Sequence, residues 1–289
     1  MDSNSIGIIG IGKMGGAIAR NLNKKGYRVL VFDLDEAKLE EFKKLGCKVA
    51  NSVLNLLCQS EKVILSLPNS NAVEEVVLGE NGLLSGDIEG KVIIDCSSSY
   101  PPSTIEIAKK VKSVEAEFID APITGVPADA EKGEINLIIG GNKNTFKKCL
   151  PLFKSMSANI FHVGPCGSGH LIKILSNYAG LSQVANMCEI LSIINKFDID
   201  PKDFWEVIKV SAANSRIYEL FMPRILNQTF DYSFSLDLAN KDLRYVCDSA
   251  HDKKSFAPVA NMVLQEYDLA CSQGLGKQDV SELIKIWDK

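Results

Sequence analysis

The N-terminal stretch of the chain constrains its fold more than any other part. A short apolar run, Ile6–Ile9, indicates a buried strand and leads directly into the turn Gly10-Ile-Gly-Lys-Met-Gly15. Apolar residues at helical spacing follow from Ala17 to Leu22, and a second apolar strand, Arg28–Phe32, ends at Asp33. This order of strand, glycine turn, helix and strand ending in an acid predicts the first half of a dinucleotide-binding unit.

The three glycines of the turn have separate mechanical roles in such a unit. The first permits the tight turn, the second lets the backbone approach the pyrophosphate, and the third allows the helix and strand to pack closely. The pyrophosphate would lie on the amides at the positive end of the helix that we expect to begin near Met14. We therefore predict cofactor contacts along the whole turn, at Gly10, Ile11, Gly12, Lys13, Met14 and Gly15.

The acid at the end of the second strand bears on the choice of nucleotide. Asp33 stands where a carboxylate accepts hydrogen bonds from the adenosine ribose hydroxyls. Asp33 and Asp35 have no arginine close in sequence and would repel a 2′-phosphate, so we expect NAD in preference to NADP. Lys38 could compensate a 2′-phosphate, but we interpret it as a solvated helix lysine. An ordinary turn between strand and helix is the alternative for the motif, and the sequence on both sides of it argues for the nucleotide.

Strands and helices alternate along the chain as far as residue 164. This alternation predicts an α/β fold with a parallel, doubly wound sheet, a Rossmann-type domain. Its later strands are expected at Lys48–Ala50, Lys62–Ser66, Lys91–Asp95, Glu117–Asp120, Ile135–Gly140 and Asn159–Val163. From Ser168 to Phe197 apolar residues recur at helical spacing without a proline, and the remaining segments also predict helices. We predict an NAD-binding domain over residues 1–164 and an all-helical substrate and oligomerisation domain over 165–289, joined by a long interdomain helix.

The composition argues against several other classes of protein. A chain of 289 residues that is 46% hydrophobic can bury a substantial core. Its formal net charge of −4 gives no general attraction to nucleic acid or to acidic membrane surfaces. The N-terminus has no basic signal-peptide region and no apolar run is long enough to span a membrane, so we expect a cytoplasmic protein. The cysteines form no CxxC pair and the histidines no ligand pair, so we expect reduced thiols and no metal site.

The loops that follow the strands are where ligands bind in a doubly wound sheet. These loops are Leu67-Pro68, Asp95-Cys-Ser-Ser98 and Asp120-Ala-Pro-Ile-Thr-Gly-Val126. Oxidation of an alcohol by NAD needs a base for the hydroxyl proton, and because no histidine lies in a matching loop, a lysine is the candidate. Lys173 and Asn177 lie four residues apart on one face of the long helix, so one can take the proton while the other fixes the oxygen.

Lys173 must lose its proton near neutral pH to act as this base. Desolvation in a closed cleft favours the neutral amine, and a neighbouring cation such as Lys241 favours it further. The carboxylate of a substrate acts in the opposite direction, so burial has to outweigh it. In the reductive direction the protonated lysine donates to the carbonyl oxygen.

Together with Gly167-Ser-Gly-His-Leu-Ile-Lys173 and the segment FSLDLANKDL at 234–243, these motifs resemble the β-hydroxyacid dehydrogenases, the 3-hydroxyisobutyrate dehydrogenase family. The resemblance covers nearly the whole chain and places spaced motifs in the family's order. It is strongest to bacterial members that act on small branched or functionalised hydroxy acids, such as the 2-(hydroxymethyl)glutarate dehydrogenases. It implies an NAD-dependent enzyme that transfers hydride between nicotinamide and a small β-hydroxy acid or semialdehyde, and a homodimer or homotetramer.

The resemblance also implies roles for individual residues. Lys173 matches the catalytic lysine and Asn177 the asparagine that orients the substrate beside it. Thr124 and Gly125 match a serine and glycine that hold the substrate carboxylate. Contacts to the nicotinamide half of the cofactor are implied for Leu67, Pro68, Asn71, Ser98 and Lys241.

Two positions depart from the family's pattern. Val126 replaces a second glycine among the predicted substrate-binding residues, and Ser176 replaces the first of two asparagines. The pair of catalytic residues, Lys173 and Asn177, is intact. The departures therefore put the identity of the substrate in doubt, because Val126 narrows or reshapes the predicted carboxylate pocket.

Other functions stay open at this point. An inactive NAD-binding regulatory or scaffold protein, an imine reductase and an NADPH-dependent reductase of glyoxylate or succinic semialdehyde share this architecture; the retained Lys173 argues against the first two. A decarboxylating sugar-acid dehydrogenase is expected to have a much larger helical domain. Four further interpretations concern single segments: Asn214-Ser-Arg216 as a distal substrate contact, Lys241-Asp242 as a possible surface pair, His170 as exposed or loosely packed, and Cys96 as a packing residue.

Overall fold

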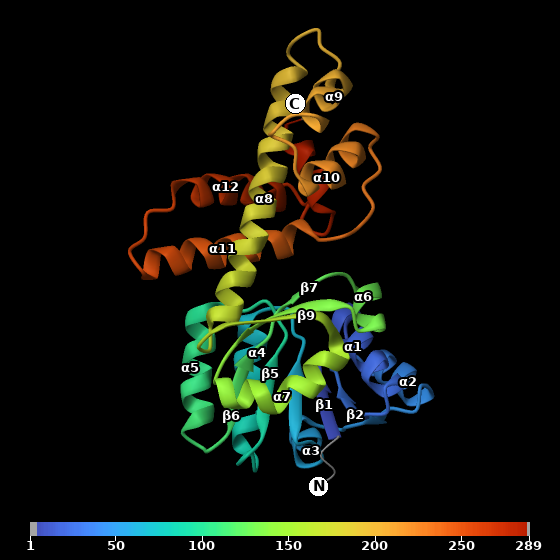
Figure 1. The fold of residues 1–289 in the computed structure, drawn as a ribbon, viewed down its shortest axis with the longest axis vertical. Coiled ribbons are helices and arrows are strands. Elements are labelled where there is room, and N and C mark those ends of the chain that lie inside the picture. The colour runs from blue at the N-terminus through green and yellow to red at the C-terminus, as the bar shows by residue number, and fades with distance from the viewer. Residues whose placement is uncertain (1–4, 288–289) are drawn as a thin grey trace. The chain divides into compact units, whose positions relative to one another are not determined.

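The computed structural model describes residues 5–287, and its internal contacts divide the chain into two units after Lys173 (Figure 1). We call the part up to Lys173 the sheet unit and the part from Ile174 onward the helical unit. The long helix α8, Ser168–Ile194, begins in the first and continues in the second. Each unit has its own hydrophobic core.

The sheet unit contains one nine-stranded sheet with the strand order β3-β2-β1-β4-β5-β6-β8-β7, and β9 pairs with β8. The first six positions reproduce the order 3-2-1-4-5-6 of a doubly wound dinucleotide-binding fold, which confirms the predicted fold class. The strands are β1 Ser5–Ile9, β2 Arg28–Phe32, β3 Lys48–Val49, β4 Lys62–Leu65, β5 Val92–Asp95, β6 Glu117–Asp120, β7 Ile123–Thr124, β8 Ile135–Gly140 and β9 Ser157–Gly164.

The central strands contain consecutive apolar residues because both faces of the sheet are covered. Alternate residues of β1 enter different cores: Ile8 packs on one face and Ile9 on the other. In β4, Ile64 lies on the first face and Leu65 on the second. Such continuous apolar runs are typical of strands buried on both sides by crossover helices.

The helices of the sheet unit connect successive strands. They are α1 Lys13–Lys24, α2 Glu36–Lys44, α3 Val53–Cys58, α4 Ser70–Leu78, α5 Pro101–Lys112, α6 Pro127–Lys132 and α7 Lys143–Met156, with a 3₁₀ turn, η1, at Leu83–Ser85. Asp35, Ser52, Asn69 and Asn142 each accept a hydrogen bond from a first-turn amide of the helix that follows, so four of these starts are set by local side-chain caps.

The sheet is not parallel throughout, which corrects the sequence-based expectation. Strands β1 to β6 are parallel, but β8 runs antiparallel to both β6 and β7. Between Asp120 and Ile135 the chain forms only the two-residue strand β7 and the single short helix α6, and it turns back beside β6. A connection that returns alongside the preceding strand produces antiparallel pairing, whereas parallel pairing needs a crossover.

The helical unit contains the remainder of α8 and five further elements. These are α9 Pro201–Lys209, α10 Arg216–Leu226, α11 Leu236–Asp252, α12 Pro258–Ser272 and the 3₁₀ helix η2, Val280–Ile286. Helices α11 and α12 pack side by side (Figure 1). The predicted all-helical texture is confirmed, although the last element is a 3₁₀ helix. Within residues 5–287, no helix combines the length and apolar character needed to cross a membrane.

A buried acid fixes the end of the helical unit. The side chain of Asp279 caps η2 by accepting hydrogen bonds from the Ser281 amide and hydroxyl. Its second oxygen accepts from the amides of Ser233 and Phe234, which ties the segment before α11 to the start of η2. A carboxylate that receives several N–H and O–H donors is well compensated for its burial.

Candidate active site

The glycine turn has the geometry that a dinucleotide site requires. Gly10 has a φ of +87°, and a Cβ built there would lie 2.4 Å from the carbonyl oxygen of Ser66. A Cβ on Gly15 would lie 2.0 Å from the Gly10 carbonyl oxygen, so the turn between β1 and α1 accepts no side chain at either position. A Cβ on Gly12, the N-cap of α1, would meet nothing within 4 Å. The structure thus leaves open space beside the first turn of α1, where the pyrophosphate is predicted to bind.

Asp33 is fixed next to this turn. Its Oδ2 accepts a hydrogen bond from the Ile11 amide at 2.8 Å, and its Oδ1 accepts one from the Asp35 amide at 2.9 Å. The Lys38 ammonium lies 3.6 Å from Asp33 Oδ1 and 3.4 Å from Asp35 Oδ2. Lys38 is solvated, as expected, but it also lies between the two carboxylates and partly offsets their charge.

The loops after β4 and β5 are tied together at the same edge of the sheet. The Leu67 amide donates to Ser97 Oγ at 2.9 Å, and the Ser97 amide donates to Oδ1 of the fully buried Asp95 at 2.9 Å. A Cβ on Gly10 would lie 3.0 Å from Leu67 Cδ2, so this loop also adjoins the glycine turn. The structure therefore gathers the predicted contacts Leu67, Pro68, Ser98 and the glycine turn at the ends of β1, β4 and β5, with Asn71 exposed on the first turn of α4.

Thr124 ends β7 and is oriented by a chain of two asparagines. Asn159 Nδ2 donates to Asn136 Oδ1 at 2.8 Å, so the amide group of Asn136 faces Thr124 and donates to its Oγ1 at 3.1 Å. Because Thr124 Oγ1 accepts this hydrogen bond, its own O–H is left for a further acceptor. That polarity suits a carboxylate ligand. Asn136 is not among the predicted site residues, because its pairing with Thr124 follows from the antiparallel register of β7 and β8.

Gly125 and Val126 continue from Thr124 into α6. Gly125 has a φ of +129°, and Val126 is the N-cap residue of α6 with an exposed side chain. The Val126 amide donates to Asp129 Oδ2 at 3.0 Å. The donors that remain here for the predicted carboxylate are the Thr124 hydroxyl and the Gly125 amide, and Val126 would contribute only its side chain.

Lys173 belongs to the sheet unit, although it lies on α8. The segment before it is attached to the end of β6 because Asp120 Oδ1 accepts from the Gly167 amide and Asp120 Oδ2 from the His170 amide, both at 2.8 Å. The expectation that His170 is exposed or loosely packed is wrong. Its side chain is fully buried, and its Nδ1 lies 2.8 Å from Thr104 Oγ1.

In the helical unit a second set of predicted residues comes together. Asn177, one turn after Lys173 on α8, donates through Nδ2 to Asp242 Oδ2 at 2.6 Å. The Lys241 ammonium lies 3.2 Å from Asp242 Oδ1 and 5.2 Å from the centre of the Tyr245 ring. Asp242 is only 2% exposed, so the interpretation of Lys241-Asp242 as a surface pair is wrong. Asp242 links the two residues that sequence reasoning had assigned separately.

The segment Asn214-Ser-Arg216 has a local structural role. Ser215 is the N-cap of α10 and accepts from the Tyr218 amide at 3.3 Å, while Asn214 Nδ2 donates to Glu219 Oε1 at 3.0 Å. Its contact with a substrate stays a prediction.

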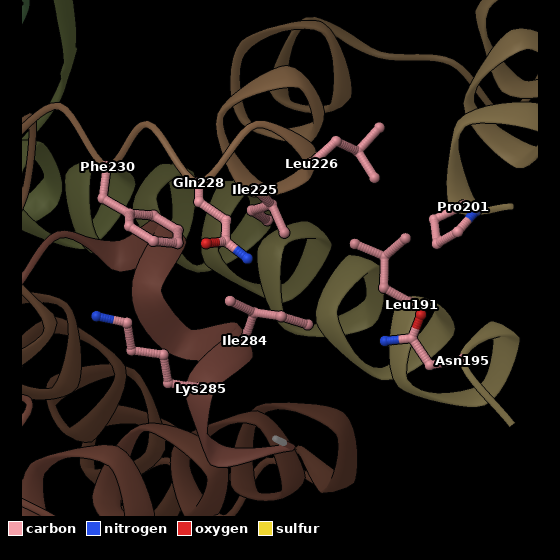
Figure 2. Close-up of a pocket in the computed structure, with 9 residues that line it drawn as sticks. All are labelled: Leu191, Asn195, Pro201, Ile225, Leu226, Gln228, Phe230, Ile284 and Lys285. Carbon is pink, nitrogen blue, oxygen red and sulfur yellow. The ribbon is translucent and has the colours of Figure 1, made fainter.

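The helical unit also has a cavity of about 280 Å³ (Figure 2). It is lined by Leu191, Asn195, Pro201, Ile225, Leu226, Gln228, Phe230, Ile284 and Lys285. The charge of Lys285 is already compensated because its ammonium pairs with Glu282. The cavity lining includes neither Asn177 nor Lys241, so the cavity is separate from the cluster around Asp242.

Family models match both parts of the chain. Residues 5–164 match the NAD-binding domain of 6-phosphogluconate dehydrogenase. Residues 167–287 match a domain described as the NAD-binding domain of NADP-dependent 3-hydroxyisobutyrate dehydrogenase. These models meet close to the predicted domain boundary at residue 164, whereas the division by contacts lies after Lys173.

Curated proteins match over nearly their whole length. The 2-(hydroxymethyl)glutarate dehydrogenase of Eubacterium barkeri is 32% identical over 288 residues, which cover 99% of this chain and 96% of that protein. The NAD-dependent L-serine dehydrogenase of Pseudomonas aeruginosa is 30% identical over 290 residues, which cover 98% and 97%. Among solved structures, the 3-hydroxyisobutyrate dehydrogenase of Mycobacterium tuberculosis with L-serine superposes with a TM-score of 0.90 at 22% identity over 99% of each chain, and so shares the fold.

Proposed function

Because the chain belongs to the 3-hydroxyisobutyrate dehydrogenase family of NAD(P)-binding oxidoreductases that act on small hydroxy acids, we propose that it transfers hydride between NAD and a small β-hydroxy acid or its semialdehyde, with Lys173 as the general acid–base. The observation that carries this proposal is the attachment of the Lys173 segment to the end of β6. It places a lysine in the same unit as the glycine turn and Thr124.

The residues of the sheet unit fit the cofactor. The open space at Gly12 admits the pyrophosphate, and Asp33 is held with a side chain 13% exposed to receive the ribose hydroxyls. Bound NAD would supply the acceptor for the hydride. The further cofactor contacts of the proposal in the sheet unit are Lys13, Met14, Leu67, Pro68, Asn71 and Ser98. Lys241, on α11, stays a predicted cofactor contact.

The chain's own residues handle the proton and the carboxylate. During oxidation, the hydrogen on the alcohol carbon leaves with its bonding electrons as hydride, while Lys173 takes the hydroxyl proton. Asn177 holds the substrate's hydroxyl oxygen in place. The Thr124 hydroxyl and the Gly125 amide donate to the substrate carboxylate, which orients the reacting carbon. Asp242 accepts from Asn177 and thereby fixes the direction of its amide.

The central test is a screen for NADH formation over small hydroxy acids with wild type and Lys173→Ala. We expect Lys173→Ala to lower kcat at least 10²-fold with little change in the Kd of NAD, as for the loss of a general base. Lys196→Ala, which removes an exposed lysine near the far end of the same helix, is the matched control. Comparable turnover in Lys173→Ala would remove the lysine from the mechanism. A wild type that binds NAD but turns over no acid would favour an inactive NAD-binding protein.

The preference for NAD is tested at Asp33. We expect Asp33→Ala to weaken NAD binding more than NADP binding, because the ribose hydroxyls lose their acceptor while the 2′-phosphate loses a repelling charge. Isothermal titration of both nucleotides measures the difference. Equal losses would contradict the assignment of Asp33 to the ribose.

A second candidate is an NADPH-dependent semialdehyde reductase, and the place of Lys38 supports it. The ammonium already lies within 3.6 Å of Asp33, where it could pair with a 2′-phosphate. Glyoxylate/succinic semialdehyde reductase 2 of Arabidopsis thaliana is 29% identical over 281 residues. Tighter binding of NADP than NAD by wild type, abolished in Lys38→Ala, would favour this function over the first.

We also propose that the protein forms a homodimer or homotetramer. Exposed apolar side chains lie along one side of α12 at Val259, Met262 and Leu269. Light scattering at several protein concentrations measures the mass, and a monomer at all of them would contradict the proposal.

A further inference from the structure

We propose that Thr104 and His170 are positioning residues that hold the first turn of α8 on the sheet and thereby set the place of Lys173. The inference rests on the proposed role of Lys173. It assigns a function to a buried polar cluster that does not itself take part in the chemistry. The cluster consists of Asp95, Thr104, Asp120 and His170, all no more than 1% exposed.

The end of β6 provides the first attachment. Asp120 lies well before α8 in sequence, yet its two oxygens receive the Gly167 and His170 amides at 2.8 Å each. These amides belong to the start of the helix, where N–H groups have no partner within the helix and the dipole favours a negative charge. Asp120 therefore caps α8 from a neighbouring strand and fixes the position of its first turn.

The side chain of His170 provides the second attachment. Thr104 Oγ1 lies 2.8 Å from His170 Nδ1 and 3.2 Å from the Tyr100 carbonyl oxygen, so its hydroxyl joins the imidazole to the first turn of α5 by hydrogen bonds. On the opposite side of the ring, His170 Nε2 lies 3.7 Å from Asp95 Oδ2 at the end of β5. The imidazole is held between α5 and β5, which fixes the rotation of α8 about its axis.

Close backbone packing leaves this turn no room to move toward the sheet. A Cβ on Gly169 would lie 2.5 Å from the Ile138 carbonyl oxygen and 2.8 Å from Asp120 Oδ2. The contacts accordingly assign Ser168–Lys173 to the sheet unit, although the helix continues far beyond. Lys173 follows His170 by three residues, which is less than one turn of the helix. A rotation or shift of the attached turn therefore moves Lys173 directly.

The expected consequence of loosening the attachment is a loss of turnover with little loss of cofactor binding. A displacement of about 1 Å between reacting groups can cost on the order of 10²-fold in rate. Neither Thr104 nor His170 is among the predicted cofactor contacts, which include the glycine turn and Asp33. We expect at least a tenfold decrease in kcat and a change of less than twofold in the Kd of NAD.

The test replaces Thr104 by valine, which keeps the volume and removes the hydroxyl that hydrogen-bonds with His170. Steady-state kinetics, NAD titration and thermal unfolding are measured together, with kinetics well below the unfolding midpoint. Thr145→Val, the same change at a buried threonine on α7, is the matched control. Thr104→Ser keeps the hydroxyl and should restore most of the wild-type kcat.

Wild-type kcat in Thr104→Val, with only a lower unfolding temperature, would overturn the inference. If Thr104→Val does not fold, His170→Asn and His170→Leu decide, because the side-chain amide of Asn can form a hydrogen bond near the position of Nδ1 and Leu cannot. A kcat clearly higher in His170→Asn than in His170→Leu supports positioning, and equal values overturn it. The proposed function fails separately, when Lys173→Ala remains active; an inactive Lys173→Ala beside a fully active Thr104→Val refutes the positioning role alone.

Discussion

The stability of the helical unit should depend on pH through Glu266. This residue lies on α12 and is partly buried, and its Oε2 has no hydrogen-bond partner among residues 5–287. Burial and, second to it, the charge of Glu189 on α8 together raise the pKa of Glu266 from 4.5 to about 7. Buried carboxylates without donors favour the neutral form.

The sign of the effect follows from the direction of the shift. Because the pKa is higher in the folded than in the unfolded chain, the folded state binds the proton more tightly. The resulting stabilisation is complete below pH 4.5 and is lost as the pH rises through about 7. A change from 4.5 to about 7 corresponds to at most roughly 3 kcal/mol at ~1.36 kcal/mol per pH unit, and partial solvent access reduces this to about 2 kcal/mol.

Glu266→Gln removes the titration while keeping the shape of the side chain. Urea unfolding should give nearly the same free energy for variant and wild type at pH 4, and about 2 kcal/mol more for the variant at pH 8. Glu89→Gln, at an exposed glutamate of the sheet unit, controls for the change of net charge. A difference that is equal at the two pH values, or a variant less stable at pH 8, would refute the reasoning.

Two further predictions concern the sheet unit. Gly15→Ala should weaken NAD binding at least tenfold, because its Cβ would lie 2.0 Å from the Gly10 carbonyl oxygen and the turn must shift; calorimetric titration measures this, and an unchanged Kd would contradict the role of the turn. Cys96 should resist alkylation at pH 8 in the folded protein, since burial and then the charge of Asp95 raise the pKa of its thiol far above the usual range. The exposed Cys58 should react under the same conditions, as mass spectrometry of the digested protein can show, and faster labelling of Cys96 would contradict its interpretation as a packing residue.

Elements with a strong periodic signal could be predicted from the sequence. The bounds of β6 and β8 agree with the structure, since each strand has consecutive buried apolar residues at its centre and turn residues on both sides. The segments β7 and α6 were missed because two and six residues carry no measurable periodicity. The antiparallel direction of β8 was therefore also not predicted, because it depends on how this connection folds.

The candidate site shows the same division between local and distant signals. The glycine turn and Asp33 could be found because their roles depend on neighbours within one strand–helix–strand unit. The partner of Thr124, Asn136, and the partner of Asn177, Asp242, could not, since each contact joins different elements. The sequence places Asp242 only beside Lys241, whereas the structure shows it buried at 2% exposure with contacts to both Asn177 and Lys241.

Strands that end in an acid have two outcomes in this sheet, and the difference explains why His170 was misjudged. Asp33 directly follows β2 beside the glycine turn, keeps 13% of its side chain exposed and remains available to a ligand. Asp95 and Asp120 end the paired strands β5 and β6 in register with each other and are fully buried. Two buried carboxylates on adjacent strands require donors. Asp120 receives them at the start of α8, from the Gly167 and His170 amides, and Asp95 receives them from the Ser97 amide and the Ser99 hydroxyl, with the His170 imidazole packed beside it. A histidine that follows a glycine-rich turn is therefore better interpreted together with the acids that end neighbouring strands than by its own local sequence, because those acids decide whether the helix start is exposed or held against the sheet.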